Sequence, residues 1–312
     1  MIDLNDIDKP GAGSDNVVIL PSDSRFIDNT DVIIEFIKSI IKEAENATAA
    51  SAMEIRFDLS KVERLDEAMI NILLTLVNYL DILGYDYIGN FPINKECRDM
   101  LVKSGFLNHV ETDVAIKSTQ DTIFTLCGDN QTNDKAIGEE ILKITHVLTD
   151  ENHPYPPLYT TLGEIAANSV EHANADIRKK NWFLSVHYES DRVIVMMADI
   201  GRGILGTIGC LCNEVSSDTS VGTQSPTDIL KDIFAGNFQS STLEANRYNG
   251  LPDMVPRVKA SFLNNIVVIS NNAFFDFSGK ATRILNNSFP GTFYLIEVTT
   301  ENIEIWKNRS KS

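Results

Sequence analysis

Residues 192–204 read RVIVMMADIGRGI, a strongly apolar run that ends in a glycine-containing turn. The run predicts a buried strand, and Asp199 stands at its end. Gly201 and Gly203 follow, with Ile204 after the second glycine. Alone, this D-x-G-x-G pattern is a weak indication of a nucleotide site, because turns whose glycines supply positive φ angles have the same sequence.

Residues 162–173, LGEIAANSVEHA, are the second informative segment and predict a helix. Glu164, Asn168 and His172 are spaced four residues apart, so they lie on one line along this helix. Taken alone, such a polar line is most often a solvent-exposed face. The adjoining face is expected to be buried and consists of Leu158, Leu162, Ile165, Ala166, Ser169 and Ala173.

A further predicted strand lies between these two patterns, and two more patterns lie downstream of them. Residues 182–190 predict a strand that a tight turn joins to the strand before Asp199. Downstream, the Asn-Gly-Leu of residues 249–251 precedes a predicted helix, and the Gly-Thr of residues 291–292 opens a predicted final strand.

Together, these four patterns resemble the motif boxes of the GHKL ATPases, a family that includes gyrase-type proteins, Hsp90, histidine kinases and anti-sigma serine kinases. The resemblance covers residues 137–300 and is closest to the anti-sigma-kinase type. It implies a Bergerat-type fold, an α/β two-layer sandwich that binds ATP with Mg²⁺. It also places an ATP lid at 205–249, a polar segment with one predicted helix at 226–236. Tyr248 departs from the family, because an earlier glycine is common there.

The resemblance implies a role for each motif residue. Glu164 would be the catalytic base that orients the attacking water, and Asn168 would offer a carbonyl oxygen to Mg²⁺. Asp199 would accept a hydrogen bond from the adenine amino group, and Thr292 would lie near the adenine. Gly250 would direct a helix N-terminus toward the phosphates. The other residues implied to bind the cofactor are His172, Gly201, Gly203, Ile204, Asn249 and Leu251.

The first half of the chain alternates between strand and helix patterns. An amphipathic helix is predicted at 31–44, and a long apolar helix at 66–84 ends at a glycine. This alternation predicts a sheet with helices packed on it and right-handed crossovers. The expected strands are residues 16–20, 54–60 and 85–91, and the third expected helix is residues 94–106.

Residues 57–106 carry a resemblance to the STAS domain, the small fold of anti-sigma-factor antagonists, and the resemblance covers residues 15–112. Glu67 follows Asp66 where switching members carry a phosphorylatable serine. A carboxylate cannot accept phosphate, so we do not expect this domain to be a phospho-switch. Asp66 and Glu67 are instead expected to cap the helix and to interact favourably with its dipole.

The composition limits the class of protein. A chain of 312 residues that is 43% hydrophobic has room for two cored α/β domains. Its net charge of −17 argues against nucleic acid as the main partner. The N-terminus does not resemble a signal peptide, and no apolar run approaches the roughly 20 residues that span a bilayer. We therefore expect a cytoplasmic protein with no membrane partner.

Three segments are expected outside the two domains. Residues 1–14 would be a flexible N-terminus, residues 113–136 a connection with one strand at 122–127, and residues 301–312 a C-terminal tail. The four cysteines are spaced unlike a zinc site and are expected to be reduced thiols. They are Cys97, Cys127, Cys210 and Cys212.

The sequence therefore favours a Mg-ATP-dependent regulatory switch with ATP hydrolase activity. Two alternatives stay open: a protein serine/threonine kinase of the anti-sigma type, and a non-enzymatic module that binds ATP for interaction only. A histidine kinase is disfavoured, because the first half does not predict the two-helix hairpin with an exposed histidine that such kinases use. A protein partner is expected, and a homodimer is plausible.

Overall fold

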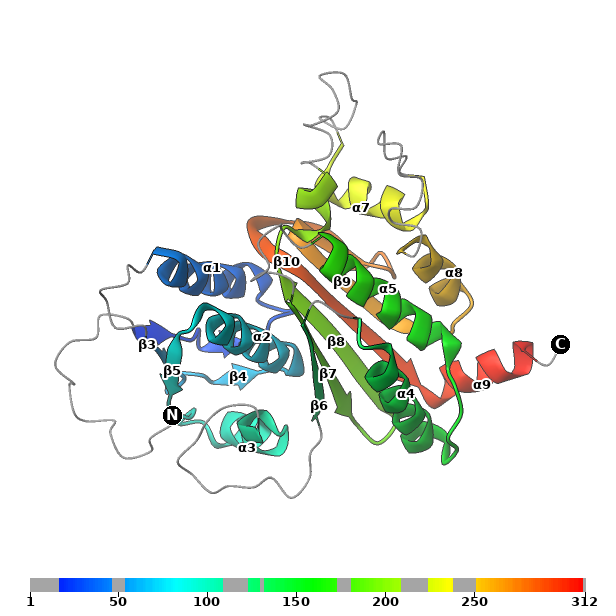
Figure 1. The fold of residues 1–312 in the computed structure, drawn as a ribbon, viewed down its shortest axis with the longest axis horizontal. Helices are drawn as coiled ribbons and strands as arrows, with labels where there is room; N and C mark the ends of the chain where they lie inside the picture. The colour runs from blue at the N-terminus through cyan, green and yellow to red at the C-terminus, as the bar shows by residue number, and fades with distance from the viewer. Residues whose placement is uncertain are drawn as a thin grey trace. The chain divides into compact units, whose positions relative to one another are not determined.

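The chain forms two compact units that divide it between Ile123 and Phe124 (Figure 1). Each unit combines helices with a sheet, through parallel pairing in the first and antiparallel pairing in the second. The protein is therefore mixed α/β, as the sequence predicts. This computed structural model describes residues 17–46, 54–108, 123–129, 132–172, 181–208, 224–237 and 251–310.

The first unit contains a parallel sheet in the order β1-β3-β5, which confirms the predicted alternation of strand and helix. Two-residue strands β2 and β4 pair beside it, and the sequence does not predict them. The strands are β1 (Val17–Ile19), β2 (Asp23–Ser24), β3 (Glu54–Asp58), β4 (Arg64–Leu65) and β5 (Asp86–Gly89). The helices are α1 (Thr30–Asn46), α2 (Glu67–Leu83), α3 (Lys95–Lys103) and the 3₁₀ turn η1 (Phe106–Asn108).

Helix α2 begins and ends where its sequence predicts. Asp66 is extended at the N-cap, and its carboxylate accepts a hydrogen bond from the Met69 backbone N–H. Gly84 ends the helix in the left-handed conformation, with φ of 77°. Burial raises the pKa of the Asp66 carboxyl to about 6. The capping function expected of Asp66 is thus confirmed.

The second unit is built on a five-stranded sheet in the order β6-β7-β8-β10-β9, with α4 and α5 along one face (Figure 1). The strands are β6 (Ile123–Asp129), β7 (Asn181–Tyr188), β8 (Arg192–Ile200), β9 (Asn264–Asp276) and β10 (Arg283–Thr299). The helices are α4 (Asp134–Thr149), α5 (Pro156–His172), α7 (Pro226–Phe234), η4 (Leu251–Asp253), α8 (Met254–Lys259) and α9 (Thr300–Arg309).

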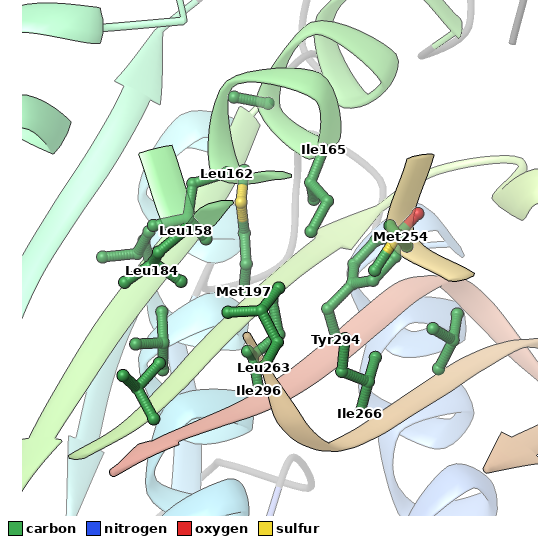
Figure 2. Close-up of a cluster of buried hydrophobic side chains, with 14 of the residues drawn as sticks. Leu158, Leu162, Ile165, Leu184, Met197, Met254, Leu263, Ile266, Tyr294 and Ile296 are labelled. Atoms are coloured by element: carbon green, nitrogen blue, oxygen red, sulfur yellow. The ribbon is translucent and has the colours of Figure 1, made fainter. Parts of the chain in front are cut away.

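The core of this unit lies between α5 and the sheet. Figure 2 shows Leu158, Leu162 and Ile165 pointing from α5 toward Met197 of β8 and Ile296 of β10, and all five side chains are buried. Such burial removes apolar area worth about 25 cal/mol per Å² from water. The face predicted for this helix is confirmed, apart from Ala173, which lies outside the described residues.

Three expectations are corrected. The strand placed in the connection is β6, an edge strand of the five-stranded sheet. Gly291 and Thr292 lie inside β10 rather than at its start, because the strand continues through an irregularity in its pairing with β9. The expected C-terminal tail contains α9, and a capping box between Thr299 and Asn302 forms the start of this helix. No helix in the described ranges has the length and apolar character needed to cross a membrane.

Candidate functional site

A cleft opens between the C-terminal half of α5 and the turn after β8. It contains about 370 Å³ of space, its open mouth included. Six of its lining residues are predicted site residues: Asn168, Asp199, Gly203, Ile204, Leu251 and Thr292. The others are Ser169, Arg202, Thr207 and Tyr294. The fold thus brings together residues from α5, β8, β10 and η4 that are far apart in the sequence.

Asp199 is held by hydrogen bonds to both of its carboxylate oxygens. Ser169 Oγ donates to Oδ2 at 2.9 Å, and the Thr292 backbone N–H donates to Oδ1 at 3.2 Å. Burial nevertheless raises the pKa of the Asp199 carboxyl to about 6, because these two bonds only partly offset the loss of water. The carboxylate is fixed in direction and retains lone pairs for a further donor.

Gly203 is required by packing on β9 and β10. Its φ is +70°, and a Cβ here would lie 2.4 Å from Asn271 Oδ1 and 2.7 Å from the Gly291 carbonyl oxygen. Asn271 Oδ1 also accepts a hydrogen bond from the Gly206 backbone N–H at 3.0 Å, in the helical turn that begins at Gly203. The glycine therefore has a structural reason that is independent of any ligand.

Gly201 and Gly291 lie against Asp199, although neither is among the described residues that line the cleft. At Gly291, φ is +146°, and a Cβ would lie 1.9 Å from the Asp199 carbonyl oxygen, so only glycine lets β10 approach β8 this closely. That approach places Thr292 opposite Asp199 in the strand register. A Cβ at Gly201 would lie 3.4 Å from Asp199 Oδ1, so the missing side chain leaves space beside the carboxylate.

Glu164 is not among the described lining residues, although it lies one turn before Asn168 on α5. Arg257 of α8 bonds to both of its carboxylate oxygens, at 3.3 and 3.4 Å. Burial raises the pKa of the Glu164 carboxyl, and Arg257 opposes that shift. The predicted base is thus paired with a cation that the sequence reasoning did not identify.

Three predicted residues cannot be placed in the cleft. His172 is the last residue of α5, and its side chain lies outside the described part of the chain. Asn249 and Gly250 also lie outside the described residues. The helical spacing predicts Ser169 only as part of the buried face, although a hydroxyl on an apolar helix face is itself a signal for a polar partner.

No model of a known protein family matches the sequence, and neither does any curated protein. Function is therefore inferred from the cleft and its residues. A fixed carboxylate with spare acceptor capacity selects a ligand that carries an N–H donor, and the amide oxygen of Asn168 suits a hard cation.

Proposed function

We propose that the second unit is a Bergerat-fold ATPase of the GHKL type, which binds Mg-ATP in this cleft and acts as a nucleotide-dependent regulatory switch. The observation that supports this most is the meeting of Asn168 with Asp199, two residues from separate motifs, in one cleft. Leu251 and Thr292, from the two other motifs, line the same cleft.

In this proposal Asp199 recognises the adenine. Its carboxylate accepts the hydrogen bond of the exocyclic amino group, while Ser169 and the Thr292 N–H hold it in place. The space beside Gly201 admits the edge of the ring next to the carboxylate. Because a purine with a carbonyl at that position offers no donor, this contact favours adenine over guanine.

Asn168 serves the phosphate end of the cleft. Its amide can offer a carbonyl oxygen, a hard ligand of the kind that Mg²⁺ prefers, and it projects from a rigid helix packed on the sheet. When bound, Mg²⁺ would neutralise charge on the phosphates. This one amide oxygen is what supports the proposal of a magnesium-chelated triphosphate.

Glu164 is the proposed general base. It lies four residues before Asn168, so both side chains leave α5 on the same line. Its carboxylate would orient and deprotonate a water molecule.

The first unit is proposed to be a STAS-like domain that presents a surface to a protein partner. Its parallel sheet and capped helix α2 support this assignment. Glu67 stands in the first turn of α2 where switching members carry a serine, so phosphorylation of this position is not part of the proposal. A cytoplasmic location and a homodimer belong to the same proposal.

Phosphate release and phosphate transfer separate hydrolysis from kinase activity. We expect wild type to release phosphate from Mg-ATP slowly, and Glu164→Gln, which keeps the shape of the side chain, to lose about 10²-fold or more. Labelled γ-phosphate found on a protein hydroxyl instead of in solution would favour the serine kinase alternative. Equal rates in wild type and Glu164→Gln would contradict the role given to Glu164.

A further inference from the structure

Arg257 of α8 makes several polar contacts to α5 and η4 that the proposed function does not yet use. Its Nη1 donates to Thr161 Oγ1 at 2.6 Å and to Glu164 Oε2 at 3.3 Å. Its Nη2 donates to Glu164 Oε1 at 3.4 Å and lies 3.5 Å from Asp253 Oδ2. One guanidinium therefore connects two residues of α5 with one residue of η4.

The contacts of Arg257 are better suited to orienting the Glu164 carboxylate than to stabilising the fold. The Arg257 and Glu164 side chains are only 14% and 23% exposed, so both charges lose much of their hydration. Such pairs are often no more stabilising than apolar residues of the same volume. A guanidinium that contacts both oxygens of a carboxylate does, however, fix the plane of that carboxylate.

The pairing also leaves Glu164 able to act. A carboxylate offers about four lone-pair positions, and the two bonds from Arg257 occupy two of them. Both bonds are longer than the roughly 2.7–2.9 Å of a tight charge-assisted pair. Arg257 therefore orients the Glu164 carboxylate and still leaves it able to accept a hydrogen bond from water.

Arg257 further connects the base to the cleft. Leu251, which lines the cleft, opens η4, and α8 continues directly from η4 to Arg257. Figure 2 shows Met254 of α8 beside Tyr294, another lining residue, and both are buried in the core. The segment that carries Arg257 is thus anchored at the wall of the cleft.

We infer that Arg257 is the positioning residue for Glu164: its guanidinium sets the direction in which the Glu164 carboxylate meets the attacking water. This inference rests on the proposed function, because it assigns a purpose to the geometry of the proposed base. Thr161 supports it by holding the same nitrogen of Arg257 from one turn earlier on α5.

The first test uses the nucleotide-free protein. Carbon-13 NMR of labelled glutamate carboxyls measures the titration of Glu164 in wild type, Arg257→Gln and Arg257→Lys. We expect Arg257→Gln to raise the pKa of Glu164, because the opposing cation is lost while the burial stays. Arg257→Lys should keep a value near wild type, since it keeps the charge but cannot contact both oxygens.

The second test measures phosphate release from Mg-ATP. We expect Arg257→Gln to lower kcat about 10- to 100-fold with KM little changed. In a plot of kcat against pH, the fall in activity on the acid side should move to higher pH, because the pKa of Glu164 is raised. Arg257→Lys should also lower kcat but leave the acid side of the pH profile unchanged. The two variants thus separate the orientation of the Glu164 carboxylate from the effect of the neighbouring charge. The matched control is Arg192→Gln, which removes an arginine paired with Glu189 and Glu297 at the start of β8.

The outcomes are distinct. If wild type hydrolyses ATP but Arg257→Gln leaves kcat unchanged, Arg257 does not position the base, and the proposed function stands. If Arg192→Gln lowers kcat as much as Arg257→Gln does, the effect is a general one on the fold, and the inference is overturned. If wild type binds no nucleotide, the proposed function and this inference fall together.

Discussion

Ser169 and Asp199 are joined by a hydrogen bond of 2.9 Å, from the hydroxyl of α5 to the carboxylate at the end of β8. The two residues are 30 positions apart in the sequence. This bond fixes the proposed base-recognition group to the helix that carries Asn168. Asp199 and Asn168 are therefore held in a fixed position relative to each other.

Asp199→Asn is expected to make the protein more stable while it removes ATP binding. The folded-state pKa of about 6 lies above the usual 3.8, so the folded protein holds this proton more tightly than the unfolded chain does. That contribution is fully present below about pH 4 and is lost as pH rises through about 6. The asparagine avoids this loss, so the unfolding free energy of the variant should exceed that of wild type by about 3 kcal/mol near neutral pH.

Urea unfolding of both proteins across this pH range checks the sign. The gain should shrink toward zero below about pH 3, where the wild-type carboxyl is protonated in both the folded and the unfolded state. Asp66, whose pKa is also about 6, titrates in wild type and variant alike, so the difference between them isolates Asp199. A gain that does not vary with pH would contradict the assigned cause.

Gly203→Ala is expected to destabilise the second unit by about 2–4 kcal/mol. The new Cβ would need the space of Asn271 Oδ1 and of the Gly291 carbonyl oxygen, at a φ that alanine rarely adopts. Gly163→Ala on α5 is the matched control, since nothing lies within 4 Å of its added Cβ. The control should gain about 0.5–1 kcal/mol, as alanine favours helix over glycine. Thermal denaturation of the two variants measures both effects.

Asn168→Ala is expected to abolish the effect of Mg²⁺ on nucleotide binding. The variant loses the amide oxygen but keeps Asp199 and its partners, so affinity for ATP in the presence of a chelator should stay near that of wild type. Titration with a fluorescent ATP analogue, with and without Mg²⁺, separates the two contributions. A variant that responds to Mg²⁺ as wild type does would place the metal contact elsewhere.

Trp306→Ala is expected to destabilise the second unit by about 2–4 kcal/mol. Trp306 of α9 stacks on His153 and meets Tyr155 edge-on, so its loss opens a gap beside the start of α5. Lys307→Ala is the comparison, because its ion pair with the largely exposed Glu151 is worth under about 1 kcal/mol. Equal effects of the two substitutions in urea unfolding would contradict the larger contribution given to the ring contacts of Trp306.

Local signals predict most of the elements. Helix α2 begins at the capping side chain of Asp66 and ends at Gly84, which lacks a side chain. Its limits can therefore be predicted from residues that are local in the sequence. The residues of the α5 face follow in the same way from helical spacing. Residues of all four motif patterns line the same cleft: Asn168 from within α5, Asp199 near the end of β8, Leu251 at the start of η4 and Thr292 from within β10.

The features that escaped prediction depend on distant partners. The continuation of β10 through Gly291 is decided by the close approach of Asp199, and the Glu164–Arg257 pair by the packing of α8 on α5. The helix α9 contains three charged residues among its last seven and has no strong apolar periodicity, so it resembles a tail. Its stability comes from Trp306 and Ile303 packing on the rest of the unit.

The most direct test of the central claim is calorimetric titration of wild type and Asp199→Asn with a non-hydrolysable ATP analogue and Mg²⁺. We predict that wild type binds the ATP analogue but not the matching GTP analogue, and that Asp199→Asn, folded and at least as stable, binds neither. Equal affinity of the two proteins for the ATP analogue, or no binding heat with wild type at any analogue concentration, would contradict a Mg-ATP site in this cleft.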